Sequence, residues 1–137
     1  MKPVVLALCL AALAGCVTAS APVDPTAPPV RDDLVGRWAM ELITDQGADV
    51  SAEQNPAGDR YIVLRPDGTF ESGGQPYGRN TGQWRYHAPS RTLGLDSDAG
   101  PDNDSLWIVT LRDGRMEWGG TGSAFARRFR IVARRAG

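Results

Sequence analysis

Residues 82–95, GQWRYHAPSRTLGL, carry the pattern that decides the fold. Trp84 and Tyr86 alternate with polar residues in the first half, and Leu93 alternates with smaller residues in the second. An apolar residue at every second position is typical of a half-buried strand. The tetrapeptide between the halves, HAPS at residues 87–90, contains the proline and serine that favour turns. The stretch therefore predicts an antiparallel β-hairpin.

The same period of two recurs on both sides of this hairpin. Eight strands are predicted, at residues 34–43, 60–65, 68–72, 81–87, 91–96, 105–111, 115–119 and 127–133. Short turns separate most of them, so consecutive strands should pair antiparallel. Residues 44–59 read as a long loop, and no segment beyond residue 30 has a convincing helical period. The sequence predicts an all-β domain, a small eight-stranded antiparallel up-and-down barrel.

Composition excludes several other classes of protein. A chain of 137 residues holds one domain at most, and its 16 Gly and 10 Pro argue against a helical bundle. The formal net charge is -1, so the chain lacks the positive electrostatic field that is typical of nucleic-acid-binding proteins. One His and two Cys leave little material for metal or nucleophile chemistry.

The N-terminus has the pattern of an export signal. Lys2 precedes an apolar run at residues 3–13, which is too short to span a bilayer and fits a signal peptide. The following tetrapeptide, LAGC at residues 13–16, resembles the lipobox of bacterial lipoproteins. The resemblance implies cleavage after Gly15 and lipid attachment to Cys16. The alternative is an ordinary secretory signal that is cleaved around residues 19–21.

A lipid anchor divides the chain into three parts. Residues 1–15 are the predicted signal peptide, residues 16–33 the lipidated Cys and a disordered linker rich in Pro and Ala, and residues 34–137 the barrel domain. The anchor implies a cell-envelope protein. Val17 in place of Asp implies the outer membrane, facing the periplasm. Because Cys9 leaves with the signal and Cys16 carries lipid, the mature domain has no disulfide and relies on its core.

The first strand carries a further family resemblance. Residues 34–38, LVGRW, resemble the Gly-x-Trp signature of lipocalins and related calycin-type barrels. In those families the Trp closes one barrel end and packs against an Arg from near the end of the barrel. For this chain the resemblance implies Trp38 paired with Arg128 or Arg130. It also implies a small apolar or amphipathic ligand at the open barrel mouth, unless the four Trp fill the interior.

An acidic segment is the candidate metal site. Carboxylates at alternating positions around Gly100 could supply the hard oxygen ligands that Ca²⁺ prefers. The residues are Asp96, Asp98, Asp102 and Asp104. A solvated turn is the alternative, because Asp, Asn, Gly and Pro also serve loop geometry. No other cofactor is expected.

Two further features of the sequence bear on whether the chain is an enzyme. His87 is predicted to be an exposed hairpin residue, because nothing near it in the sequence suggests a catalytic triad. The glycine-rich residues 119–123 lack the Lys of a phosphate-binding loop. The chain is therefore not expected to be an enzyme.

The C-terminal strand is rich in Arg and could meet anionic lipid head groups. The alternative is that the Arg cluster only reflects the composition of the chain, since every basic residue after Lys2 is Arg.

Together these features predict a lipid-anchored monomer that binds a small ligand and no nucleic acid. One alternative is a structural or protein-interaction lipoprotein with a filled barrel. Another is an exported protease inhibitor of the eight-stranded barrel type, because the first strand also resembles the first strand of that family. That family typically carries a disulfide, which the mature chain cannot form.

Overall fold

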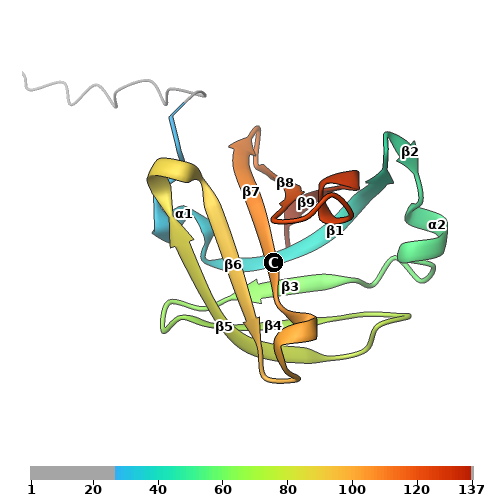
Figure 1. Cartoon of the computed structure of the whole chain (residues 1–137), viewed down its shortest axis with the longest axis horizontal. Helices are drawn as coiled ribbons and strands as arrows, with labels where there is room; N and C mark the ends of the chain where they lie inside the picture. Colours follow the sequence, from blue (N-terminus) through green and yellow to red (C-terminus); the bar gives the residue numbers. More distant parts are fainter. Residues whose placement is uncertain (1–26, 137) are drawn as a thin grey trace, which may run out of the picture.

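The computed structural model describes residues 27–136, whose strands form one closed antiparallel sheet (Figure 1). Eight strands follow one another as neighbours, and the last pairs back with the first, so the predicted eight-stranded up-and-down barrel is confirmed. Each of these strands begins and ends within two residues of its predicted bounds. The strands are β1 (Gly36–Asp45), β3 (Tyr61–Leu64), β4 (Thr69–Gly73), β5 (Asn80–His87), β6 (Thr92–Ser97), β7 (Ser105–Arg112), β8 (Arg115–Thr121) and β9 (Phe129–Arg135).

The connections contain short elements that the sequence did not predict. The loop predicted at residues 44–59 contains β2 (Ala48–Asp49), which pairs with β1, and the helix α2 (Ser51–Gln54). A second helix, α1 (Arg31–Leu34), precedes the barrel, so the structure includes one turn before the predicted domain start at Leu34. Four-residue helices are too short to show a helical period. The 3₁₀ turns are η1 (Ala88–Ser90), η2 (Pro101–Asn103) and η3 (Ala126–Arg128).

The predicted signal peptide, Cys16 and most of the linker lie outside the described residues. Within residues 27–136, no helix is long and apolar enough to cross a membrane.

The barrel interior is largely filled by apolar side chains. They come from α1 and from each of the eight barrel strands, and their burial stabilises the barrel. The most buried large residues are Trp38, Phe70, Leu34, Ile62, Leu64, Leu93, Met116 and Val109. A cavity of about 140 Å³ lies among these side chains, with Met40, Phe70 and Trp118 in its lining, and it reaches the exposed Tyr77. It is smaller than the roughly 300–1,000 Å³ of a typical pocket for a drug-sized ligand.

The two barrel ends differ. The chain enters at the end that α1 covers, where Leu34 is fully buried and Arg31 stacks 4.2 Å from the centre of the Trp84 ring. We call this the α1 end. The longer connections, at residues 46–60, 74–79, 98–104 and 122–128, emerge at the opposite end. We call that the loop end.

Candidate functional site

A large hollow lies at the loop end. It is a groove of about 680 Å³ between the adjoining ends of β6 and β7 and the connections that contain η2 and η3. We call it the rim groove, and its principal lining residues are Asp96, Asp102, Asp104, Leu106, Trp107 and Phe125. Its volume falls within the range of small-molecule sites, whereas that of the interior cavity does not.

Leu106 lines the rim groove, and two of the residues beside it are glycines. It lies on the outer side of β7, directly opposite Gly94 of β6. A Cβ atom at Gly94 would lie 3.4 Å from a methyl group of Leu106, and one at Gly122 would lie 3.5 Å from the other. Leu106 therefore rests over bare backbone and stays 47% exposed.

Phe125 overhangs the groove on a connection that is held firmly to the barrel. Its ring meets that of Phe129 edge to face, at 5.2 Å between centres. Arg128 anchors the same connection with two hydrogen bonds to the Asp45 carboxylate, at 2.9 and 2.7 Å. This ion pair also raises the pKa of Arg128. Phe125 nevertheless stays 66% exposed and lines the groove, so part of its aromatic surface borders the groove.

Gly120 lets this connection approach the barrel. A Cβ atom at Gly120 would lie 1.9 Å from the carbonyl oxygen of Ala126, far inside van der Waals contact. At the preceding residue, Gly119, the nearest atom to a Cβ would be the Ile108 carbonyl oxygen, at 3.9 Å. The shape of the rim groove therefore depends on a glycine at position 120.

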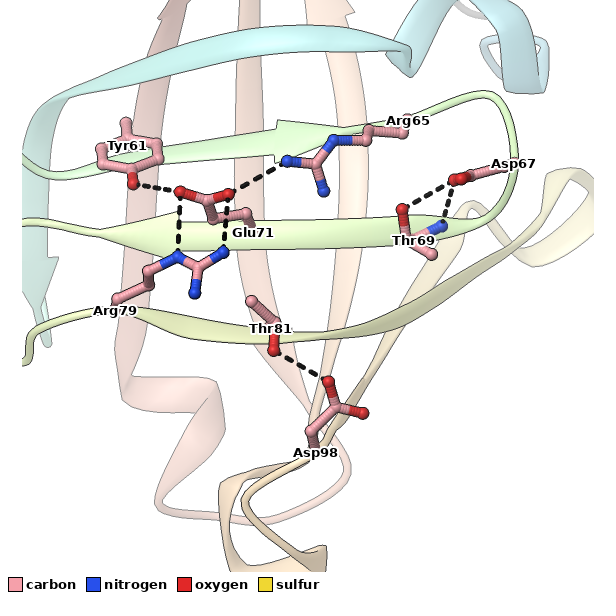
Figure 2. A network of polar contacts seen from close by, with 8 residues as sticks. All are labelled: Tyr61, Arg65, Asp67, Thr69, Glu71, Arg79, Thr81 and Asp98. Carbon is pink, nitrogen blue, oxygen red and sulfur yellow. Dashed lines mark hydrogen bonds and ion pairs between the residues drawn. The ribbon is translucent and has the colours of Figure 1, made fainter.

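The four predicted calcium ligands do not come together. Asp96, Asp102 and Asp104 line the rim groove, whereas Asp98 lies outside it and accepts a 2.8 Å hydrogen bond from Thr81 (Figure 2). Asp104 also caps the backbone, because it accepts a 2.8 Å hydrogen bond from the Ser97 amide. No three His, Cys, Asp or Glu side chains of residues 27–136 are grouped as a metal would require. The geometry gives no support to the calcium prediction, which a titration with Ca²⁺ still has to test.

The predicted barrel-closing pair needs correction. Arg135, and not Arg128 or Arg130, stacks on Trp38, with its guanidinium carbon 4.3 Å from the ring centre. The register explains this, because β9 places Arg135 opposite Trp38 and Arg130 opposite Thr44, near the other end of β1. Arg135 also donates hydrogen bonds to the carbonyl groups of Val35 and Asp33, at 2.8 and 2.7 Å. The expected cation–π contact exists, but the last residue of β9 makes it.

A polar network that the sequence did not predict covers the outside of β3, β4 and β5 (Figure 2). The Glu71 carboxylate accepts hydrogen bonds from Tyr61 at 2.7 Å and from Arg65 at 3.0 Å, and it also pairs with Arg79. The Tyr61 hydrogen bond, followed by those of Arg79 and Arg65, lowers the pKa of Glu71 to about 2. These contacts join neighbouring strands, and none of the four residues lines the rim groove. The network is therefore a feature of the barrel wall.

A second hollow, of about 450 Å³, lies on the outer wall formed by β7, β8, β9 and β1. Its exposed apolar residues include Ile108 and Leu42, and Arg127 and Arg130 of the predicted basic strand border it. We call this surface the outer wall.

His87 is exposed at the end of β5, and its Nδ1 lies 2.8 Å from the Ser90 hydroxyl. This is the predicted hairpin position.

Comparisons with known proteins add information about the fold. No protein-family model matches the chain, and no curated protein sequence matches it. Among solved structures, the fold is similar to that of a DUF4847 family protein from Bacteroides vulgatus, with a TM-score of 0.54 and 15% sequence identity. The match covers 74% of this chain and 92% of that one. At this identity the similarity shows a shared fold and nothing more.

Proposed function

We propose that this chain is a lipid-anchored protein of the cell envelope whose barrel binds a small amphipathic molecule in the rim groove. The observation that carries the proposal is the contrast between a filled interior, with about 140 Å³ left, and an external groove of about 680 Å³. The proposed site therefore lies at the rim of the barrel and outside its filled interior.

The lining of the groove suits a molecule with one apolar and one polar part. Leu106, Trp107 and Phe125 offer aliphatic and aromatic surface, and removing such surface from water on binding contributes about 25 cal/mol per Å². The Asp side chains and Ser123 border the same hollow with polar groups. Sites of this kind gain affinity from the apolar contact and orientation from a few polar groups.

The place of the rim groove agrees with an anchor at Cys16. The described chain enters at the α1 end, and the groove lies at the opposite end. A tether at the α1 end would leave the loop end free to face away from the lipid.

The anchor has its own test. Expressed in a Gram-negative host, the full chain is expected in the membrane fraction and to incorporate a labelled fatty acid. Cys16→Ser should move the protein to the soluble fraction without label. An unlabelled wild-type protein would contradict the anchor and leave the groove unaffected.

The groove can be tested with Nile red, a neutral dye that fluoresces in apolar surroundings. The non-lipidated full chain (Cys16→Ser) is expected to bind it, and the double substitution Leu106→Ala with Phe125→Ala should weaken binding about tenfold, or 1.4 kcal/mol. Tyr77→Ala is the matched control, because Tyr77 is 62% exposed at the loop end but does not line the groove. Equal dye binding by all three proteins would contradict the proposal.

The outer wall favours a second candidate, a protein-interaction lipoprotein with a filled barrel. Ile108 is 46% exposed and Leu42 is 36% exposed, and both border a hollow that a partner side chain could enter. A photo-crosslinking amino acid at position 108, compared with one at exposed Gln83 on β5, tests it in cells. A discrete adduct at position 108 alone would support this candidate.

A further inference from the structure

Among the residues that line the rim groove, acidic side chains outnumber basic ones. Three carboxylates line it, from Asp96, Asp102 and Asp104, and Arg85 is the cationic side chain among its lining residues. From this imbalance and from the aromatic lining, we infer that the ligand is an amphipathic cation, with an apolar body and an amine or ammonium group. This inference rests on the proposed function, because it specifies the chemical class of ligand for the same groove.

The carboxylates are available to a ligand. The side chains of Asp96 and Asp102 make no hydrogen bond or ion pair within residues 27–136, and both residues are exposed. Asp104 uses one oxygen to accept from the Ser97 amide, which leaves its second oxygen without a contact in the described chain. A ligand ammonium can therefore approach these groups without breaking an ion pair of the protein.

The cations near the groove offset this charge only in part. Arg85 is exposed on β5, opposite Gly94, at the edge of the groove. Arg128 lies 5.5 Å from the centre of the Phe125 ring, but its guanidinium forms the two hydrogen bonds to Asp45. Arg127 borders the hollow of the outer wall instead. Across the groove, acidic side chains outnumber unpaired basic ones.

The aromatic residues favour the same ligand class. The faces of Trp and Phe rings attract cations, because their π electrons carry a partial negative charge. Phe125 and Trp107 both line the groove, and Phe125 is 66% exposed. Because Asp102 and Asp104 belong to the η2 connection and Phe125 to the η3 connection, the groove has an acidic side and an aromatic side with Leu106 between them. A cationic head and an apolar body can thus be held at the same time.

The test compares three probes that share one apolar body and differ in charge. They are 4-phenylbutylamine, 4-phenylbutan-1-ol and 5-phenylpentanoate, titrated by calorimetry into the non-lipidated full chain (Cys16→Ser). The amine is expected to bind about tenfold more tightly than the carboxylate at low salt. Its advantage should shrink in 0.5 M NaCl, because salt screens exposed charges.

Variants then locate the charge effect. The double substitution Asp96→Asn with Asp102→Asn should weaken amine binding about five- to tenfold and leave binding of the alcohol unchanged. Asp98→Asn is the matched control, because Asp98 belongs to the same acidic segment but does not line the groove. It should bind all three probes as the wild-type chain does.

The outcomes separate this inference from the proposed function. Equal affinity for the three probes, or preference for the carboxylate, overturns the inference and leaves the groove as a binding site. Nile red binding without any amine binding has the same meaning. If neither Nile red nor any of the three probes binds, both the inference and the proposed function fail.

Discussion

Among single residues, the buried tryptophans differ in how their indole N–H groups are satisfied. Trp38 donates to the Leu34 carbonyl and Trp84 to the Arg65 carbonyl, each at 2.9 Å. The Nε1 of Trp118 is buried and finds no acceptor among residues 27–136. A buried donor without a partner costs free energy that a hydrogen-bonded one does not.

This difference predicts the cost of two matched substitutions. Trp84→Phe and Trp118→Phe remove the same volume, but only Trp84→Phe also leaves the Arg65 carbonyl without its indole donor. We expect Trp84→Phe to lower the free energy of unfolding by about 1 kcal/mol more than Trp118→Phe does. Urea unfolding followed by circular dichroism measures both. An equal or larger loss for Trp118→Phe would contradict the account.

The corrected closing contact gives a second prediction. Arg135→Ala removes the stacking on Trp38 and two hydrogen bonds, so we expect it to lower the free energy of unfolding by about 1–2 kcal/mol. Arg130→Ala, an exposed position on the same strand, should change it by less than about 0.5 kcal/mol. The thermal unfolding midpoints of the two variants give the comparison. The reverse order would restore the pairing predicted from the sequence.

The sequence predicted the type of this contact but not the residue that makes it. The motif at residues 34–38 indicated an Arg on Trp38, and the chain offers five Arg between 127 and 135. The choice among them depends on the register of β9 on β1, which includes a shift between Met40 and Leu42. A local bulge of this kind leaves no mark in an alternating pattern.

At the scale of elements, Glu71 links β3, β4 and the start of β5 through a pH-dependent network. Its pKa in the folded chain is about 2, below the usual 4.5, because Tyr61, Arg79 and Arg65 donate to the ionised form. A lowered pKa means that the stabilisation is fully present above the unfolded value and is lost as pH falls from about 4.5 to 2.

We therefore expect the thermal midpoint of the wild-type chain to fall more steeply between pH 4.5 and pH 2 than that of Glu71→Gln. Glu53→Gln, at an exposed position on α2, should follow the wild-type curve. Scanning calorimetry across this range tests the prediction, and parallel curves for wild type and Glu71→Gln would refute it.

The packing of η3 on β8 gives a prediction at the same scale. Gly120→Ala forces its Cβ against the Ala126 carbonyl, so the connection that bears Phe125 has to move. We expect a loss of about 1–3 kcal/mol in the free energy of unfolding, together with weaker Nile red binding. Gly119→Ala, at the adjacent position with free space, should change neither quantity appreciably. If both variants behave alike, Gly120 does not set the groove.

The strands were the feature of this protein that the sequence predicted best. A period of two predicts the strands and, in the hairpin of Trp84 and Leu93, the side that faces inward, because burial on one side imposes alternation. In β1 it predicts the strand but not the inward side throughout, because the shift after Met40 leaves Leu42 exposed and buries Ile43. The rim groove could not be predicted in this way. It depends on Gly94 standing opposite Leu106 and on the η3 connection folding back over Gly120, and both require the register between strands.

For the whole molecule, the filled core leaves the rim groove as the place where we propose that a ligand binds. The core gives a chain without disulfides in its described residues a rigid frame. The loop end then carries the exposed aromatic and acidic groups, opposite the end at which the chain enters. The lipid anchor proposed at Cys16 would hold the protein at a membrane, and the rim groove would bind the ligand.

Chemical-shift mapping tests the central claim most directly. The ¹⁵N-labelled, non-lipidated full chain (Cys16→Ser) is titrated with 4-phenylbutylamine, and the amide shifts are followed residue by residue. The account predicts changes at the rim groove, strongest around Gly94, Leu106 and Phe125, with the amides of Ile62 and Phe70 in the barrel interior unmoved. Shifts confined to the interior, or no shifts at any amide, would contradict it.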